Sequence, residues 1–101
     1  MDIKFFNKNI LDFIESLDYF YKADITKSLE FLESFGHKID LPYSKSLGRG
    51  LFELRCVSSG ARLFYVFKNN EAVVLHIIIK KQKRIPKKDL DLVKKRQKMF
   101  K

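Results

Sequence analysis

Apolar residues in the first third of the chain recur at the spacing of an α-helix. One stripe begins just after Asn9, which suits the N-cap of a helix, and holds Ile10, Phe13, Ile14 and Leu17. A second stripe stops at Gly36, because glycine readily takes the left-handed conformation found where helices end. Its members are Tyr21, Ile25, Leu29, Leu32 and Phe35. The pattern predicts two helices that form a hairpin and cover one face of a sheet.

After this hairpin the pattern changes to that of β-strands. Residues 37–50 contain one proline and two glycines, which predicts a loop. Three segments rich in β-branched and aromatic residues follow, at 51–57, 61–67 and 72–79. They are separated by Ser58-Ser59-Gly60 and by residues 68–71, and both separators are typical of hairpin turns. These segments predict a three-stranded antiparallel meander.

The last part of the chain returns to a helical pattern. In residues 87–100, Leu90, Val93 and Phe100 fall on one side, and Pro86 suits the first turn. With 101 residues and 46% hydrophobic content, the chain holds one small core, so we expect a single domain over residues 1–101. The predicted fold class is α+β: an N-terminal helical hairpin packed on an antiparallel β-meander, then a basic C-terminal helix. The pattern leaves open whether residues 1–7 pair as an added edge strand.

Composition excludes several classes of protein. The single cysteine, Cys56, cannot form an internal disulfide and is expected to be inert core. No apolar segment is long enough for a signal peptide or a membrane span, which predicts a cytoplasmic protein without a membrane partner. The two histidines, His37 and His76, are far apart, and no Gly-rich phosphate loop is present. We therefore expect neither a metal nor a cofactor.

Charge is concentrated at one end of the chain. Residues 80–101 hold eleven Lys and Arg against two Asp, a net charge of +9. Residues 1–79 hold ten basic and ten acidic side chains and are neutral. A localised basic surface predicts a polyanionic partner such as RNA.

Two arginines stand inside the predicted strands. Arg55 and Arg62 lie at similar distances from the Ser58-Ser59-Gly60 turn, so antiparallel pairing would place them within about one residue of each other. Two guanidinium groups this close repel each other unless an anion joins them, so the pair predicts an anion site. Four more cations begin at the end of the third strand: Lys80, Lys81, Lys83 and Arg84.

Such a group of cations can bind phosphates and stabilise a pentacovalent phosphorane without a metal. Proton transfer would then fall to one of the basic side chains or to His76. Structural alternatives remain open for each residue. Arg62 could pair with a carboxylate such as Glu53, Arg55 could form an ion pair or a phosphate contact, and the lysines could be a solvated strand end. His76 could be a half-buried structural residue.

Three fragments together resemble the phage-derived Gp49-like, HigB-type branch of the RelE/ParE toxin superfamily. They are Leu-Gly-Arg-Gly-Leu-Phe-Glu-Leu-Arg at 47–55, Ser-Gly-Ala-Arg-Leu-Phe-Tyr at 59–65, and the run from Val74 to Lys88. The resemblance covers residues 9 to 100 and includes the order helix, helix, meander and basic helix. It implies a toxin of a type II toxin–antitoxin pair that enters the ribosomal A site and cleaves mRNA.

The resemblance also assigns residues and partners. The ribose 2′-hydroxyl is implied to attack the adjacent phosphate without a metal, assisted by catalytic residues at the positions of Arg55, Arg62 and Lys81. RNA binding would involve Lys80, Lys83, Arg84, Lys87 and Lys88. The implied partners are the ribosome, mRNA and a cognate helix-turn-helix, HigA-like antitoxin. The sequence departs from RelE at Glu53, which replaces a lysine, and after Lys81, where no base-stacking tyrosine follows.

Two other functions fit the same fold, because a fold does not fix its function. One is a ParE-like, non-enzymatic inhibitor of DNA gyrase, and the other is a non-catalytic RNA-binding module. The cluster of Arg55, Arg62 and Lys81 favours the nuclease, since a protein-binding inhibitor does not need these cations in one patch.

Overall fold

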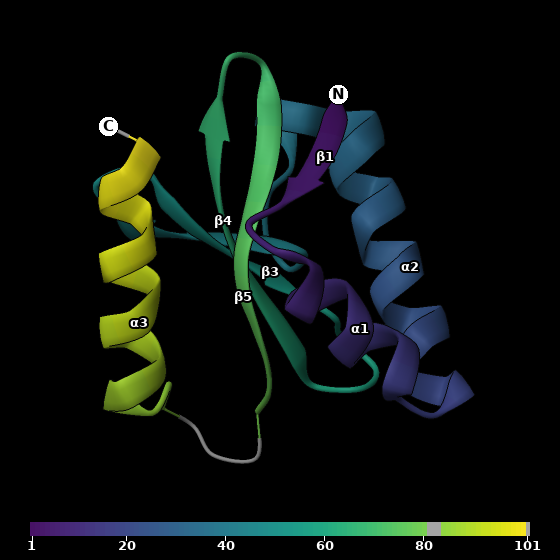
Figure 1. Ribbon diagram of the computed structural model, residues 1–101. Coiled ribbons are helices and arrows are strands. Elements are labelled where there is room, and N and C mark those ends of the chain that lie inside the picture. Colours follow the sequence, from purple (N-terminus) through teal and green to yellow (C-terminus); the bar gives the residue numbers. More distant parts are fainter. Residues whose placement is uncertain (81–83, 101) are drawn as a thin grey trace.

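The computed structural model describes residues 1–80 and 84–100, so Lys81, Lys83 and Lys101 lie outside the described residues (Figure 1). Its helices are α1 (Lys8–Ser16), α2 (Tyr19–Phe35) and α3 (Lys87–Gln97), with short 3-10 turns η1 (Gly36–Lys38) and η2 (Lys98–Phe100). Its strands are β1 (Asp2–Phe5), β2 (Ser44–Gly48), β3 (Leu51–Arg55), β4 (Ala61–Lys68) and β5 (Glu71–Ile79). The predicted α+β class is confirmed, and the elements follow the order β1, α1, α2, β2 to β5, α3 along the chain.

The sheet contains the predicted meander and two further strands. Its order is β1-β5-β4-β3-β2, with β3, β4 and β5 antiparallel to one another. At one edge β1 pairs parallel to β5, and at the other edge β2 pairs antiparallel to β3. The prediction of an unbroken loop over residues 37–50 is therefore wrong. Ser-Lys-Ser-Leu-Gly is too polar to read as a strand, but an edge strand gains its stability from pairing with its neighbour.

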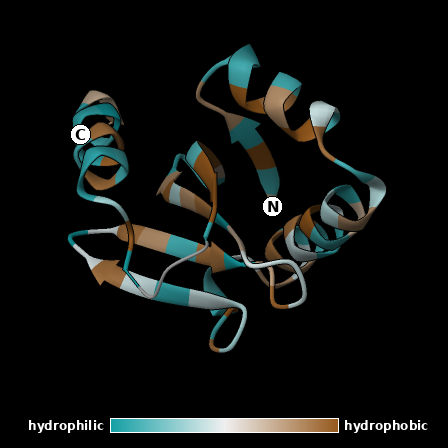
Figure 2. Ribbon diagram, turned by 90° about the horizontal axis from the view of Figure 1, so that it is seen from below, coloured by the Kyte–Doolittle hydropathy of each residue, from teal (hydrophilic) through white to brown (hydrophobic). Residues whose placement is uncertain are grey.

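The helices lie on both sides of the sheet. α1 and α2 cover one face and α3 stands on the other, an arrangement seen in Figure 1 and, from below, in Figure 2. On the first face Ile10 and Ile14 of α1 and Ile25 and Leu32 of α2 belong to one buried cluster with side chains of β3, β4 and β5. On the second face the fully buried Val93 of α3 belongs to a separate cluster. The sheet therefore carries a core on each face.

Local signals set the helix ends. The N-cap of α1 is Asn7, whose side chain accepts a hydrogen bond from the Ile10 backbone N–H at 3.1 Å, so the prediction of Asn9 is wrong by two residues. α2 ends at Gly36, which has φ +54°, as predicted. Pro86 directly precedes α3. None of the helices in the described chain has the length and apolar character needed to cross a membrane.

Candidate functional site

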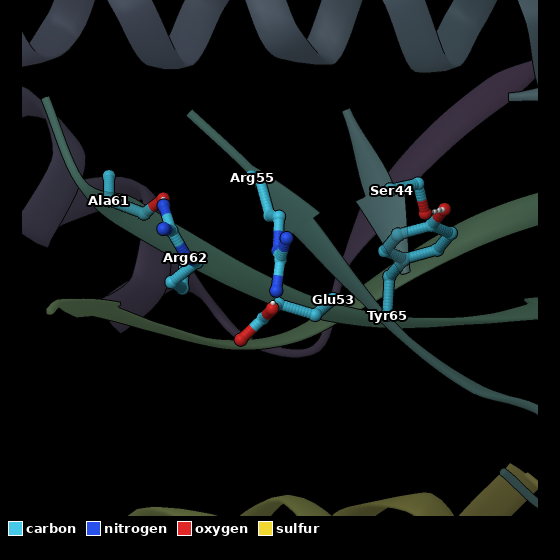
Figure 3. A network of polar contacts seen from close by, with 6 residues as sticks. All are labelled: Ser44, Glu53, Arg55, Ala61, Arg62 and Tyr65. Atoms are coloured by element: carbon cyan, nitrogen blue, oxygen red, sulfur yellow. Dashed lines mark hydrogen bonds and ion pairs between the residues drawn. The ribbon is translucent and has the colours of Figure 1, made fainter. Parts of the chain in front are cut away.

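The strand register places the two arginines directly opposite each other. Arg55 of β3 and Arg62 of β4 are paired residues in the antiparallel ladder, and Arg62 is in turn opposite Ile78 of β5. Alternation puts Leu51, Glu53 and Arg55 on the same face of β3, and Leu51 packs in the cluster beneath α3. The arginine pair therefore lies on the face that α3 flanks, and the predicted juxtaposition is confirmed (Figure 3).

Glu53 is the anion that accompanies this pair. Its side chain is only 2% exposed and accepts a hydrogen bond at 3.0 Å from the Arg55 Nε, drawn in Figure 3. The carboxylate of Glu53 is thus paired with Arg55, and the alternative that it pairs with Arg62 is wrong. Because one carboxylate stands against two guanidinium groups, the three side chains keep one net positive charge.

Arg62 keeps unused hydrogen-bonding capacity. Its side chain is half-buried, and its Nη1 donates to the Ala61 carbonyl at 3.0 Å. Its Nε–H is fully buried and has no hydrogen-bond partner among the described residues. A buried donor without an acceptor costs about 1–3 kcal/mol, so such a group needs an explanation. If the half-buried side chain turned toward solvent, an oxygen of a bound oxyanion would supply the missing acceptor.

A β-bulge brings His76 onto the same face. His76 is opposite Phe64 and Val74 is opposite Tyr65, which leaves Leu75 without a partner in the ladder. The His76 Nε2 lies 2.9 Å from the Asp89 Oδ1 in the first turn of α3, and the ring stacks on Phe64. His76 therefore stands diagonal to Arg62 on the sheet, half-buried and held by a carboxylate.

Lys80 lies at the same end of the sheet as the arginine pair. The Lys80 backbone N–H donates to the Gly60 carbonyl at 3.1 Å, one residue beyond the pairing of Ile79 with Ala61. Arg84, Lys87 and Lys88 are exposed, and Lys87 and Lys88 begin α3. Since a helix N-terminus already carries partial positive charge, these lysines add to a positive potential there. Lys81 and Lys83 belong to the segment that is not described.

Two residues of α3 have roles that the sequence did not reveal. Asp89 is the partner of His76. Arg96 is half-buried: its Nη1 donates to the Leu75 carbonyl at 2.6 Å, and its guanidinium carbon lies 4.7 Å from the centre of the Phe6 ring. Arg96 is therefore packed against β5 and Phe6. An acidic residue at position 89, in the first turn of α3, is a feature of the sequence that could have indicated a partner for His76. The Arg96 contact depends on the β-bulge, which the sequence does not mark.

Cys56 and Tyr65 are structural residues on the face covered by α1 and α2. Cys56 is fully buried, and burial raises the pKa of its thiol from 9.0 to about 11, so the thiol is protonated at neutral pH. The Tyr65 hydroxyl and the Ser44 Oγ are 2.6 Å apart in a buried hydrogen bond (Figure 3), and burial also raises the pKa of Tyr65. The prediction of an inert thiol agrees with the burial of Cys56.

Comparison with known proteins gives two matches. The family model described as "Phage derived protein Gp49-like (DUF891)" matches residues 12–98. The fold is similar to that of the isolated E. coli RelE toxin, with a TM-score of 0.64 and 15% sequence identity. That alignment covers 89% of this chain and 95% of the RelE chain. No curated protein matches the sequence.

Proposed function

Because the chain belongs to the Gp49-like family of phage-derived proteins and has the fold of the RelE toxin, we propose that it is the toxin of a type II toxin–antitoxin pair. We further propose that it is a ribosome-dependent mRNA endoribonuclease that needs no metal and inhibits translation. Its partners are the ribosome, mRNA and a helix-turn-helix, HigA-like antitoxin, and it acts in the cytoplasm.

The observation that carries this proposal is the hydrogen bonding of the Arg62 side chain. It faces Arg55 across the ladder, and its buried Nε–H has no acceptor within the described chain. Arg55 is already oriented by Glu53, so its remaining N–H groups can turn to a ligand. Two guanidinium groups with free donors suit the oxygens of one phosphate, because arginine donors match phosphate geometry.

The proposed reaction is a transesterification within the RNA backbone. The ribose 2′-oxygen attacks the adjacent phosphorus, and the bond from phosphorus to the 5′-oxygen breaks. The leaving 5′-oxygen takes a proton from water, so the products are a 2′,3′-cyclic phosphate and a 5′-hydroxyl. Negative charge grows on the phosphoryl oxygens during the attack, and Arg62 and Arg55 stabilise it. Arg62, Arg55 and, by its position after β5, Lys81 are the proposed catalytic residues.

His76 is the candidate for proton transfer. When its Nε2–H is donated to Asp89, the Nδ1 keeps the lone pair that accepts a proton from the 2′-hydroxyl. The Asp89 carboxylate also fixes the orientation of the ring. The lysines and arginine that follow β5 would hold the RNA backbone on either side of the cut: Lys80, Lys83, Arg84, Lys87 and Lys88.

Expression of the wild-type chain and of Arg62→Ala in bacteria, with mRNA cuts mapped by primer extension, tests the proposal. We expect growth arrest with cuts inside codons for the wild type, and a loss of about 10²–10³-fold in cutting for Arg62→Ala. Lys27→Ala removes an exposed cation from α2, on the opposite side of the sheet, and should cut as the wild type does.

The outcome also separates the competing functions. Growth arrest without mRNA cuts, together with broken DNA in the arrested cells, would replace the nuclease by a gyrase inhibitor. Binding of RNA without arrest or cuts would leave only an RNA-binding module. If the Arg62→Ala variant still arrests growth and still cuts mRNA at the wild-type level, the arginine pair has no part in the mechanism.

A further inference from the structure

The turn between β2 and β3 has an unusual residue at its first position. Arg49 and Gly50 are its two central residues, and both have positive φ, at 56° and 79°. Two positive φ angles are typical of the type I′ hairpin turn, which favours Asn, Asp and Gly. The β4–β5 hairpin of the same chain follows this preference with Asn69 and Asn70, at φ 51° and 62°. Arginine at position 49 is therefore unfavourable for the turn itself.

The turn is fastened to α3 through its backbone. The Gln97 side-chain Nε2 donates to the Arg49 carbonyl at 2.8 Å, and the Gly48 N–H donates to the Ser46 Oγ at 3.2 Å. These bonds fix the main chain and leave the Arg49 side chain exposed. They also use two backbone groups of the turn that a docking peptide strand would need.

A basic cavity lies between this turn and the end of α3. Its volume is about 480 Å³, and its wall includes Arg49, Lys94, Lys98 and Gln97 above a floor of Leu47 and Leu51. None of the described residues that line it is acidic. Among residues 1–80 and 84–100, none of the three cations takes part in an ion pair. Three exposed positive charges around one cavity give a positive local potential that attracts an anionic ligand.

The turn is open on its outer side. A Cβ atom built on Gly48 or Gly50 would meet no atom within 4 Å, so nothing in the described chain covers the glycine backbone there. A second, smaller cavity of about 140 Å³ also includes Arg49 and Gln97 in its wall. Arg49 thus lies between two cavities, and a ligand could contact it from either one.

We propose that Arg49, Lys94 and Lys98 form a second RNA-backbone site, which binds phosphodiester groups. The inference rests on the proposed function, since it takes RNA as the ligand of the same sheet face. Leu51 of the cavity floor and Arg55 of the arginine pair are four residues apart on β3, which is about 14 Å along the strand. Both sites flank α3, so one RNA molecule can occupy both.

RNA fits this site better than an acidic peptide does. The cavity offers separate point charges at three positions, and the backbone groups of the turn are already bonded within the protein. A peptide would need main-chain partners as well as charge, whereas a phosphate backbone needs mainly cations at intervals. The phosphates can come from the mRNA strand or from ribosomal RNA, and the experiment distinguishes these two sources.

The test uses Arg49→Asn, which removes the cation and supplies the residue that the turn prefers. We expect its melting temperature to rise by a few degrees while RNA affinity falls. Loss of one phosphate contact should reduce the slope of log K against log salt by about 0.7, and should weaken binding about fivefold at 0.1 M salt. Lys94→Gln with Lys98→Gln should reduce the slope by about 1.4. Lys27→Gln with Lys38→Gln, on the α2 side, is the matched control.

Binding is measured with a twelve-nucleotide single-stranded RNA by fluorescence anisotropy, and with ribosomes by co-sedimentation. A loss confined to the oligonucleotide identifies the mRNA strand as the ligand, and a loss confined to ribosomes identifies ribosomal RNA. Unchanged salt slopes for both ligands would overturn the proposal, as would a fall in stability of Arg49→Asn without a loss of binding. If the salt slopes of the variants change but the wild-type chain cuts no mRNA, the second RNA-backbone site is supported and the nuclease proposal fails.

Discussion

At the scale of single residues, Glu53 makes a pair of facing arginines compatible with a folded sheet. It lies on the same strand as Arg55, two residues away, and therefore on the same face. Its nearly complete burial means that its charge is stabilised by Arg55 at 3.0 Å and hardly by water. The carboxylate compensates one guanidinium and leaves Arg62 for a ligand.

Removal of this charge should therefore weaken the fold. We expect Glu53→Gln to lower the free energy of unfolding by about 1–3 kcal/mol, a value reduced from that of a fully buried pair because Arg55 is 30% exposed. Added phosphate should restore part of this loss, since an anion can then join the two arginines. Urea unfolding with and without phosphate measures both effects.

The exposed Glu30 of α2 offers a matched control for this change. Glu30→Gln should unfold as the wild type does and should respond to phosphate no more than the wild type. Equal stability of Glu53→Gln and Glu30→Gln would contradict the role given to Glu53.

At the scale of elements, specific contacts attach α3 to the sheet at its start, its middle and its end. Asp89 pairs with His76 near its start, Val93 is fully buried in the middle, and Arg96 bonds the Leu75 carbonyl near its end. The β-bulge makes two of these contacts possible, because it turns Leu75 and His76 to the same face. A helix with a largely polar sequence is thus fixed by a few specific contacts.

Arg96→Ala tests this attachment. It leaves the Leu75 carbonyl without its donor and removes the contact with the Phe6 ring, so we expect a loss of about 1–3 kcal/mol in unfolding free energy. Amide hydrogen exchange in α3 should become faster before that in β4 does. Lys95→Ala, an exposed neighbour with the same charge, should change neither quantity. Similar exchange rates in the two variants would show that Arg96 does not hold the helix.

Elements with a strong internal pattern could be predicted from the sequence, and edge elements could not. The meander follows from alternation and turn residues, and the opposition of Arg55 and Arg62 follows from their positions about one turn. β1 and β2 are short and owe their structure to the strands beside them. The partners of Arg96 and His76 depend on how α3 docks on the bulge, which local sequence does not specify.

At the scale of the whole molecule, charge and fold divide the protein into two sides. The part of the chain that forms α1, α2 and the sheet is neutral, and the net charge of +9 follows β5. α3 stands on the face opposite α1 and α2 (Figure 1), and the arginine pair lies on this same face. A positive field of this kind would accelerate association with the proposed RNA partner, and it would weaken as salt rises.

The central claim is that this face cleaves RNA through attack by the 2′-hydroxyl, with Arg62 stabilising the charge that develops. Its most direct test is cleavage of ribosome-bound mRNA by the purified protein, comparing an all-ribose message with one that carries a single 2′-deoxynucleotide at the cut. We expect the ribose message to yield a 2′,3′-cyclic phosphate end, the deoxy position to remain intact, and Arg62→Ala to cut about 10²–10³-fold more slowly. Cleavage at the deoxy position, or cutting by Arg62→Ala at the wild-type rate, would contradict the claim.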